Sequence, residues 1–156
     1  MCFQGLGLHY DDIVNLLEKS PDTPLILDHF GFTRMDTVFK TETSEDFNLL
    51  LKLAKYPNVY VKISALFRIG ALWKEDWAEE LMKTRFDPLI EAYGASRLMI
   101  GSDFPFVELE DIGYRGTFDI VSSWCDEHEN GAMIKSWILG GTAEKVFGPW
   151  GTTVMK

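Results

Sequence analysis

The sequence predicts an α/β fold built from parallel βα units. Short apolar runs, rich in Leu and β-branched residues, alternate along the chain with longer segments of helical period. Three of these runs close at His29, Ser64 and Asp103, and a strand–helix–strand unit takes roughly 30 residues or more. The spacing therefore fits one unit each time, and a series of such units implies right-handed crossovers and a parallel sheet.

Each predicted strand is a short apolar run. The last three are bounded by Pro, Gly, Asn or Ser. Near-continuous apolar runs, without polar alternation, are typical of strands that are covered on both faces of a parallel sheet. The predicted strands are residues 1–5, 24–31, 58–64 and 97–103.

The segments between the strands carry apolar residues at helical spacing. The first has an acidic first turn, and the second starts after Ser44, a good N-cap residue. Pro88 is expected to kink or split the third segment, because proline has no N–H to donate inside a helix. A break is expected at Asn130-Gly131, between the last two. The predicted helices are residues 10–20, 44–57, 75–94, 118–127 and 133–148.

Two architectures accommodate four such units in one domain: an open doubly wound sheet, and part of a (βα)8 barrel, which typically needs about 250 residues. Both place function at the C-terminal ends of the strands. The glycine-rich phosphate-binding patterns GxGxxG and GxxxxGK[ST] do not follow any predicted strand. The usual nucleotide-binding function of an open sheet therefore has no support.

Composition narrows the classes of partner. The chain has 156 residues and a net charge of -9, which disfavours nucleic acid and anionic membrane surfaces. It has no apolar run near the ~20 residues that span a bilayer, and its N-terminus does not resemble a signal peptide. Cys2 and Cys125 do not form a disulfide framework, so free thiols and a cytoplasmic location are expected.

Asp103 and His29 are the leading candidates for chemistry, because each closes an apolar run where a barrel would place its site. A carboxylate at such a position can deprotonate water or bind a metal, or it can simply cap the following turn. His29 could bind a metal or a carbonyl oxygen, or be a core histidine. Since neighbouring strand residues face opposite sides, only one of Asp28 and His29 is expected to face the interior.

Further candidates surround these two residues. Arg68 lies just past the third strand, where a guanidinium suits a substrate carboxylate or is simply exposed. Ser64 closes the same strand and is a second candidate for substrate binding. Lys62, inside that strand, must extend to water or form a pair. His9 and His128 are expected on the solvated surface.

Four motifs add up to a family resemblance. They are PLILDHFG, VYVKIS, RLMIGSDFP and ILGGTAEKVFG. Together they resemble the C-terminal half of the amidohydrolase-related family, a metal-dependent hydrolase superfamily on a (βα)8 barrel, and most closely its lactonase-like branch. The resemblance implies that residues 1–156 form a partial barrel domain, about strands five to eight.

The resemblance also implies roles for residues. Asp103 would act as general base on water or as a metal ligand, and His29 would bind metal or substrate. The family's His-x-His pair is absent from this sequence, and Thr142 stands where the family usually has Asn. A divalent metal such as zinc could therefore be bound only with the missing N-terminal half, and none is expected for this chain alone.

The function expected from this resemblance is hydrolysis of a lactone or a related carbonyl compound, a small-molecule substrate. Decarboxylation on the same scaffold is the nearest alternative. An inactive fragment that serves as an interaction or assembly module is an alternative of another class. Four units cannot close an eight-stranded barrel, so self-association or pairing with a missing N-terminal half is expected.

Overall fold

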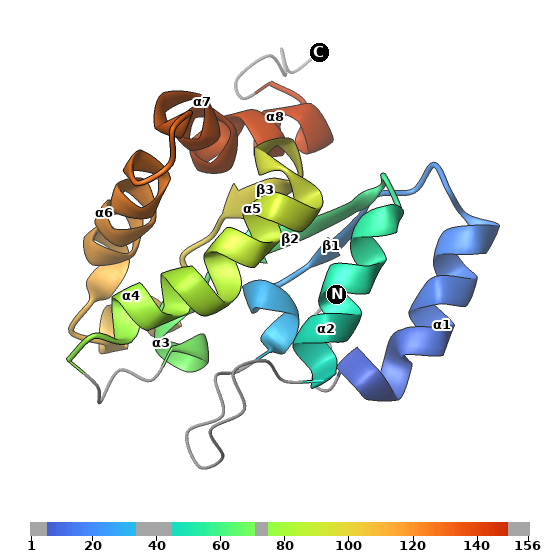
Figure 1. Cartoon of the computed structure of the whole chain (residues 1–156), viewed down its shortest axis with the longest axis horizontal. Coiled ribbons are helices and arrows are strands. Elements are labelled where there is room, and N and C mark those ends of the chain that lie inside the picture. Colours follow the sequence, from blue (N-terminus) through green and yellow to red (C-terminus); the bar gives the residue numbers. More distant parts are fainter. Residues whose placement is uncertain (1–5, 34–44, 71–74, 150–156) are drawn as a thin grey trace, which may run out of the picture.

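The computed structural model describes residues 6–33, 45–70 and 75–149. Figure 1 shows these parts as ribbons. The first predicted strand, residues 1–5, lies outside the described residues, and so do Cys2 and Ser44. The described part is an α/β structure with one parallel sheet, as the sequence predicts.

Three strands form this sheet in the order β1-β2-β3, with β1 at Leu25–Leu27, β2 at Val59–Ile63 and β3 at Leu98–Ile100. Both pairs are parallel, and Ile26 lies opposite Tyr60 in the register. The strand order follows the chain order, as expected when each unit is laid beside the previous one.

The strands are shorter than the apolar runs, and this corrects one expectation. His29, Ser64 and Asp103 lie beyond the strands, in the turns that follow them. The chain leaves extended geometry because φ is positive at His29 (53°), Ala65 (54°) and Asp103 (65°), in the left-handed region that no strand can use.

Helices occupy most of the remaining described chain. The first begins at Leu6, four residues earlier than predicted, and Leu6 itself is buried. The predicted helix over 133–148 forms with a wider π turn at its centre, Trp137–Gly141. The α-helices are α1 (Leu6–Lys19), α2 (Glu45–Lys52), α3 (Leu66–Ile69), α4 (Trp77–Leu81), α5 (Asp87–Tyr93), α6 (Gly113–Asp126), α7 (Gly131–Ser136) and α8 (Thr142–Phe147).

Shorter 3-10 and π turns complete the order of the elements. They are η1 (His29–Phe32), η2 (Leu53–Lys55), η3 (Met82–Phe86), η4 (Ala95–Arg97), η5 (Phe106–Leu109) and η6 (Trp137–Gly141). Of these, η3 and η6 are π turns.

Pro88 splits its helix as predicted. It lies in the first turn of α5, directly after the π turn η3 that separates α5 from α4. Proline offers no N–H to the carbonyl four residues earlier, that of Thr84. The guanidinium of Arg85 donates to this carbonyl instead, with 2.9 Å between Nη1 and O. The buried Arg85 therefore satisfies a helix carbonyl that Pro88 leaves without a donor.

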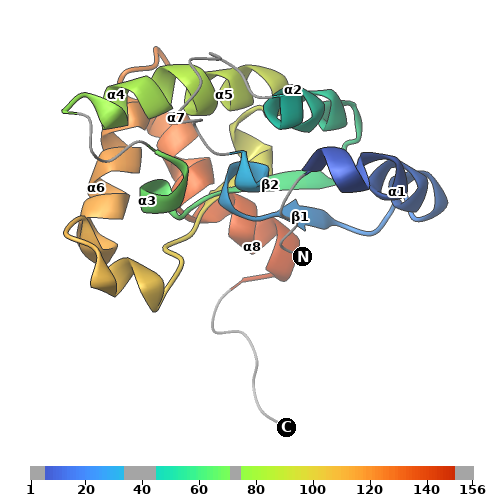
Figure 2. The ribbon, with the colours of Figure 1, turned by 90° about the horizontal axis from the view of Figure 1, so that it is seen from below.

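The sheet is covered on both faces. Helices α2, α4 and α5 lie along one face, and α8 lies on the other (Figure 2). Val59, Val61 and Ile63 are fully buried, and the alternate residue Tyr60 has the ammonium of Lys145, on α8, 5.6 Å from its ring centre. Within the described residues, no helix is long and apolar enough to cross a bilayer.

Candidate functional site

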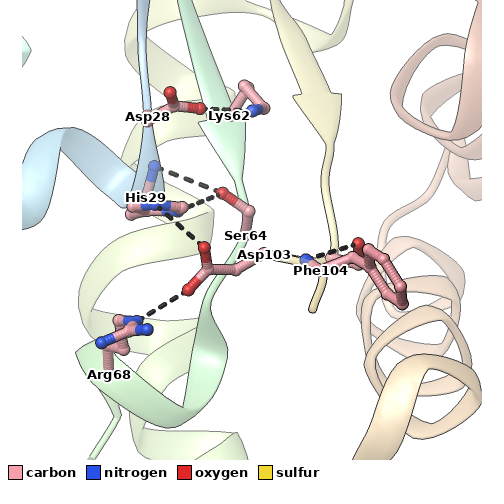
Figure 3. Close-up of polar contacts among 8 residues, drawn as sticks. Asp28, His29, Lys62, Ser64, Arg68, Asp103 and Phe104 are labelled. Carbon is pink, nitrogen blue, oxygen red and sulfur yellow. Dashed lines mark hydrogen bonds and ion pairs between the residues drawn. The ribbon is translucent and has the colours of Figure 1, made fainter. Parts of the chain in front are cut away.

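Three turns that follow parallel strands bring four predicted residues together (Figure 3). His29 follows β1, Ser64 and Arg68 follow β2, and Asp103 follows β3. Because the carboxyl ends of parallel strands lie at one edge of the sheet, residues that are far apart in the sequence become neighbours there. The structure therefore gathers the predicted residues into one cluster, which we call the strand-end cluster.

The backbone around this cluster is unusual. Four successive residues, His29 to Phe32, have φ between 52° and 64°, and only Gly31 among them lacks a side chain. A left-handed conformation costs a residue with a Cβ roughly 1–2 kcal/mol, and such conformations gather at functional sites. Asp103 after β3 and Ala65 after β2 also have positive φ. Each of the three turns that hold the cluster residues therefore contains a residue in the left-handed region.

The imidazole of His29 is held on two sides. The ring atom Nδ1 lies 2.7 Å from the hydroxyl oxygen of Ser64, and the backbone N–H of His29 donates to the same oxygen at 3.3 Å. The ring of Phe32 meets the imidazole edge-on, with 4.8 Å between the ring centres. Ser64 is fully buried. The orientation of the ring is thus fixed by a hydrogen bond and by packing.

Asp103 lies between His29 and Arg68. Its Oδ2 accepts a hydrogen bond from Arg68 Nε at 2.7 Å, and its Oδ1 is 3.6 Å from His29 Nε2. The guanidinium also lies over the ring of Phe106, 4.9 Å from its centre. Arg68 is predicted from the sequence to bind a carboxylate of the substrate. In the structure its partner is the carboxylate of Asp103.

A second ion pair lies beside the cluster. Lys62 pairs with Asp28, which agrees with the expectation that a lysine inside this strand must extend to water or form a pair. The expectation that only one of Asp28 and His29 faces the interior assumes strand geometry, but β1 ends at Leu27. The positive φ at His29 ends the alternation of the strand, so both side chains reach the same region (Figure 3).

The electrostatics keep the imidazole neutral. Burial is the main cause that lowers the pKa of His29 below its usual value of 6.5. The carboxylates of Asp103 and Asp28 oppose this shift, whereas the cations of Lys62 and Arg68 reinforce it. At neutral pH His29 therefore carries one ring proton and can donate one hydrogen bond and accept one.

The cluster does not supply a complete set of zinc ligands. His29 Nε2 and Asp103 Oδ1 are suitable donor atoms and lie near one another. A catalytic zinc typically has three protein ligands. The described residues contain no group of three or more His, Cys, Asp or Glu side chains that could hold a metal ion. The described residues thus offer two donors, fewer than a catalytic zinc takes from a protein.

The other histidines differ from expectation. His9 and His128 are both partly buried, so they are less exposed than the expectation of a fully solvated surface position. Nε2 of His128 lies 3.3 Å from Oδ1 of Asp87, and the His128 ring packs 5.9 Å from the centre of the Phe86 ring. Sequence spacing gives no signal for this pair, because it depends on how α5 meets the turn after α6.

A cleft of about 420 Å³ lies away from the cluster, between α5 and α7. Its wall includes Gly94 and Ser96, which precede β3, so it lies toward the opposite end of the sheet from Asp103. The cleft is mostly apolar, and His128 and Glu129 are the ionisable groups in its wall. We favour the strand-end cluster as the functional site, because it combines a carboxylate, a neutral imidazole and a guanidinium in contact.

Comparison with known proteins assigns the family. The model of the amidohydrolase family matches residues 9–148, so this chain belongs to the amidohydrolase family. An L-fucono-1,5-lactonase from Burkholderia multivorans is 30% identical over 136 residues, which is 79% of this chain and 42% of the relative. The resemblance drawn from the four motifs is confirmed.

Solved structures show the same fold. An amidohydrolase from Burkholderia multivorans with bound HEPES has a TM-score of 0.76 at 24% identity, over 94% of this chain and 52% of that chain. Another crystal form of it contains zinc and has a TM-score of 0.72 at 24% identity, over 94% of this chain and 51% of that chain.

A protein from Pseudomonas putida, assigned as a 2-pyrone-4,6-dicarboxylic acid hydrolase, has a TM-score of 0.67 at 24% identity, over 89% of this chain and 49% of that chain. The chain thus spans about half the length of the relatives that it matches.

Proposed function

We propose that this chain carries part of the active site of an amidohydrolase-type hydrolase that opens a lactone or a related carbonyl substrate. The observation that carries the proposal is the strand-end cluster, in which His29, Arg68 and Asp103 meet at the C-terminal ends of parallel strands. Membership of the amidohydrolase family and a lactonase relative support the reaction class.

Asp103 is the proposed general base. Arg68 holds its Oδ2, so Oδ1 is the oxygen left to take a proton from water. The hydroxide attacks the carbonyl carbon of the substrate, the ring C–O bond breaks, and the leaving oxygen takes the proton that Asp103 removed from water, which restores the base. His29, neutral at pH 7, is placed to donate a ring N–H to the carbonyl oxygen as charge develops on it.

Arg68 can contact Asp103 and substrate together. Only its Nε is used in the contact with Asp103, while the two Nη groups carry four more N–H donors. Its side chain keeps 31% of its surface exposed. We propose that these donors bind a carboxylate or hydroxyl of the substrate. Ser64, being fully buried, is placed to support His29 and not to touch substrate.

The architecture proposed for the whole protein is a (βα)8 barrel, of which this chain supplies about strands five to eight. In the described sheet β1 and β3 are the edges, and unpaired strand edges recruit other strands. Phe104 and Leu109, beyond β3, are 71% and 82% exposed, a further apolar surface to be covered. We propose that the chain pairs with a polypeptide that supplies the other strands, or with itself.

Pairing is tested by light scattering after size exclusion. A dimer or a larger species is expected, and a sharp 17.8 kDa monomer with cooperative unfolding would refute the proposal. If the complete enzyme binds zinc, His29 and Asp103 would be two of its ligands in place of their roles as donor and base, and the paired polypeptide would supply the remaining ligands.

The activity test uses this chain co-expressed with the part of the Burkholderia multivorans lactonase that it does not match. The purified assembly is assayed with zinc on sugar lactones and on 2-pyrone-4,6-dicarboxylate, with a pH indicator to follow acid release. Asp103→Asn should lower the rate about 10²–10⁴-fold, the usual cost of losing a general base.

Asp119→Asn is the matched control, because Asp119 is an exposed carboxylate that also pairs with an arginine, Arg115 on α6. It should leave the rate unchanged. A folded Asp103→Asn variant with undiminished turnover would move the role of base to another residue. A folded assembly that opens none of the lactones would overturn the proposed function.

A further inference from the structure

We propose that the buried hydroxyl of Ser64 fixes the tautomer of His29, by donating its proton to Nδ1 so that the ring proton stays on Nε2 and points at Asp103. Ser64 is thus a positioning residue, which acts on the reaction through His29. Its value for catalysis rests on the proposed function, but the tautomer itself does not.

The hydrogen bonds at Ser64 lead to this assignment. The hydroxyl oxygen already accepts the backbone N–H of His29 at 3.3 Å. The same oxygen lies 2.7 Å from Nδ1, so one proton must lie between the two atoms. A hydroxyl that accepts from the backbone and donates to Nδ1 uses both of its functions, and the neutral ring uses its lone pair.

The other side of the ring favours the same tautomer. With Nδ1 as acceptor, the proton is on Nε2, which faces Oδ1 of Asp103 at 3.6 Å. A proton there is attracted by the carboxylate. The opposite tautomer would direct the lone pair of Nε2 at the negative oxygen of Asp103, and Ser64 would accept two hydrogen bonds from His29. Both ends of the imidazole therefore favour Nε2–H.

Packing leaves the hydroxyl little freedom to leave this position. Ser64 is fully buried, and it directly follows β2, which is paired on both sides. A methyl group built on Gly101 would lie 3.1 Å from the Cβ of Ser64, so the neighbouring turn already approaches it closely. The glycine permits this approach, and the approach confines Ser64 at the Nδ1 edge of the His29 ring.

The arrangement can also be reversed by a ligand. A hydroxyl can donate or accept. If the lone pair of Nε2 is needed, for a metal or for a proton from substrate, the ring proton can move to Nδ1 and Ser64 can accept it. Alanine could do neither, and a residue with only donor groups could hold only one form. A serine can therefore hold His29 in the Nε2–H form without a ligand and can still accept a proton from Nδ1 when a ligand takes the Nε2 lone pair.

The test is ¹⁵N NMR of the whole chain with ¹⁵N-labelled histidine at pH 7.5. His29 is identified by the loss of its signals in His29→Gln. We expect Nε2 to resonate as a protonated nitrogen and Nδ1 as an unprotonated nitrogen that accepts a hydrogen bond. A protonated Nδ1 in the unsubstituted chain would overturn the proposal without any variant being needed.

Ser64→Ala removes the donor and leaves the size of the site almost unchanged. The Nδ1 signal should shift toward that of a free, unprotonated nitrogen, an effect that a purely structural role of Ser64 would not produce. Ser123→Ala is the matched control, since Ser123 is an exposed serine whose hydroxyl bonds to the Ile120 carbonyl within its own helix. An unmoved Nδ1 signal in folded Ser64→Ala would overturn the proposal.

Discussion

Gly101→Ala tests how closely the turn after β3 must approach the strand-end cluster. The added Cβ would lie 3.0 Å from Cε of Lys62 and 3.1 Å from Cβ of Ser64. The Lys62 side chain could move, although it is paired with Asp28. The Cβ of Ser64 cannot, because Ser64 is buried at the end of the central strand.

Gly101 itself cannot retreat easily. Its N–H donates to the carbonyl of Ile63 at 3.0 Å, which ties the turn to β2. The backbone of Gly101 is not in the left-handed region, so the cost comes from crowding alone. Excess volume in a packed interior typically costs about 1–3 kcal/mol. We expect this loss in the free energy of unfolding, or a melting temperature lower by about 2–12 °C for a chain of this size.

Urea unfolding followed by tryptophan fluorescence measures this loss. The control is Gly140→Ala in the π turn before α8, where an added Cβ meets nothing within 4 Å. That variant should be neutral or more stable, since alanine favours a helix by about 1 kcal/mol over glycine. Equal stability of Gly101→Ala and the unsubstituted chain would show that the turn can shift freely, and would refute the close approach.

Three further predictions follow from the described contacts. Because the folded chain keeps His29 neutral, the unfolded chain binds more protons as the pH falls below about 6.5, so stability should decline from pH 7.5 to pH 5.5. His29→Gln should flatten this decline in urea unfolding, and an unchanged pH dependence would contradict the shift. Burial raises the pKa of Cys125 to about 11. In a Cys2→Ser background, Ellman's reagent should therefore react with Cys125 at pH 8 only after urea is added. Fast labelling of the folded chain would disprove burial of the thiol. Gly31→Ala should lower the free energy of unfolding by about 1–3 kcal/mol, since φ is 64° and the new Cβ would lie 3.2 Å from both terminal carbons of Leu50; a calorimetric melt that matches the unsubstituted chain would argue against this conformation.

The sequence alone predicted the parallel units and the family. Apolar runs and helical periods are local signals, and their alternation is enough to imply a parallel sheet with its strand ends together. His29, Ser64 and Asp103 could be expected at one edge for that reason. The effect of Pro88 was also predictable, because it depends only on the missing N–H of one residue.

The contacts inside the cluster needed the tertiary structure. Arg68 meets Asp103, and Asp28 lies beside His29 in the same region, although strand alternation predicts otherwise. Partly buried His128 near Asp87 is a similar case. These pairs join different elements, and no periodicity in the sequence fixes which atoms meet.

The physical reason lies in the turns after the strands. A strand sets the direction of its side chains by alternation, but a residue with positive φ ends that rule and redirects the chain. His29 and Asp103 both have such values. Sequence determined that these residues follow neighbouring parallel strands. Only the left-handed turns decided that Nδ1 of His29 faces Ser64 while Nε2 faces Asp103.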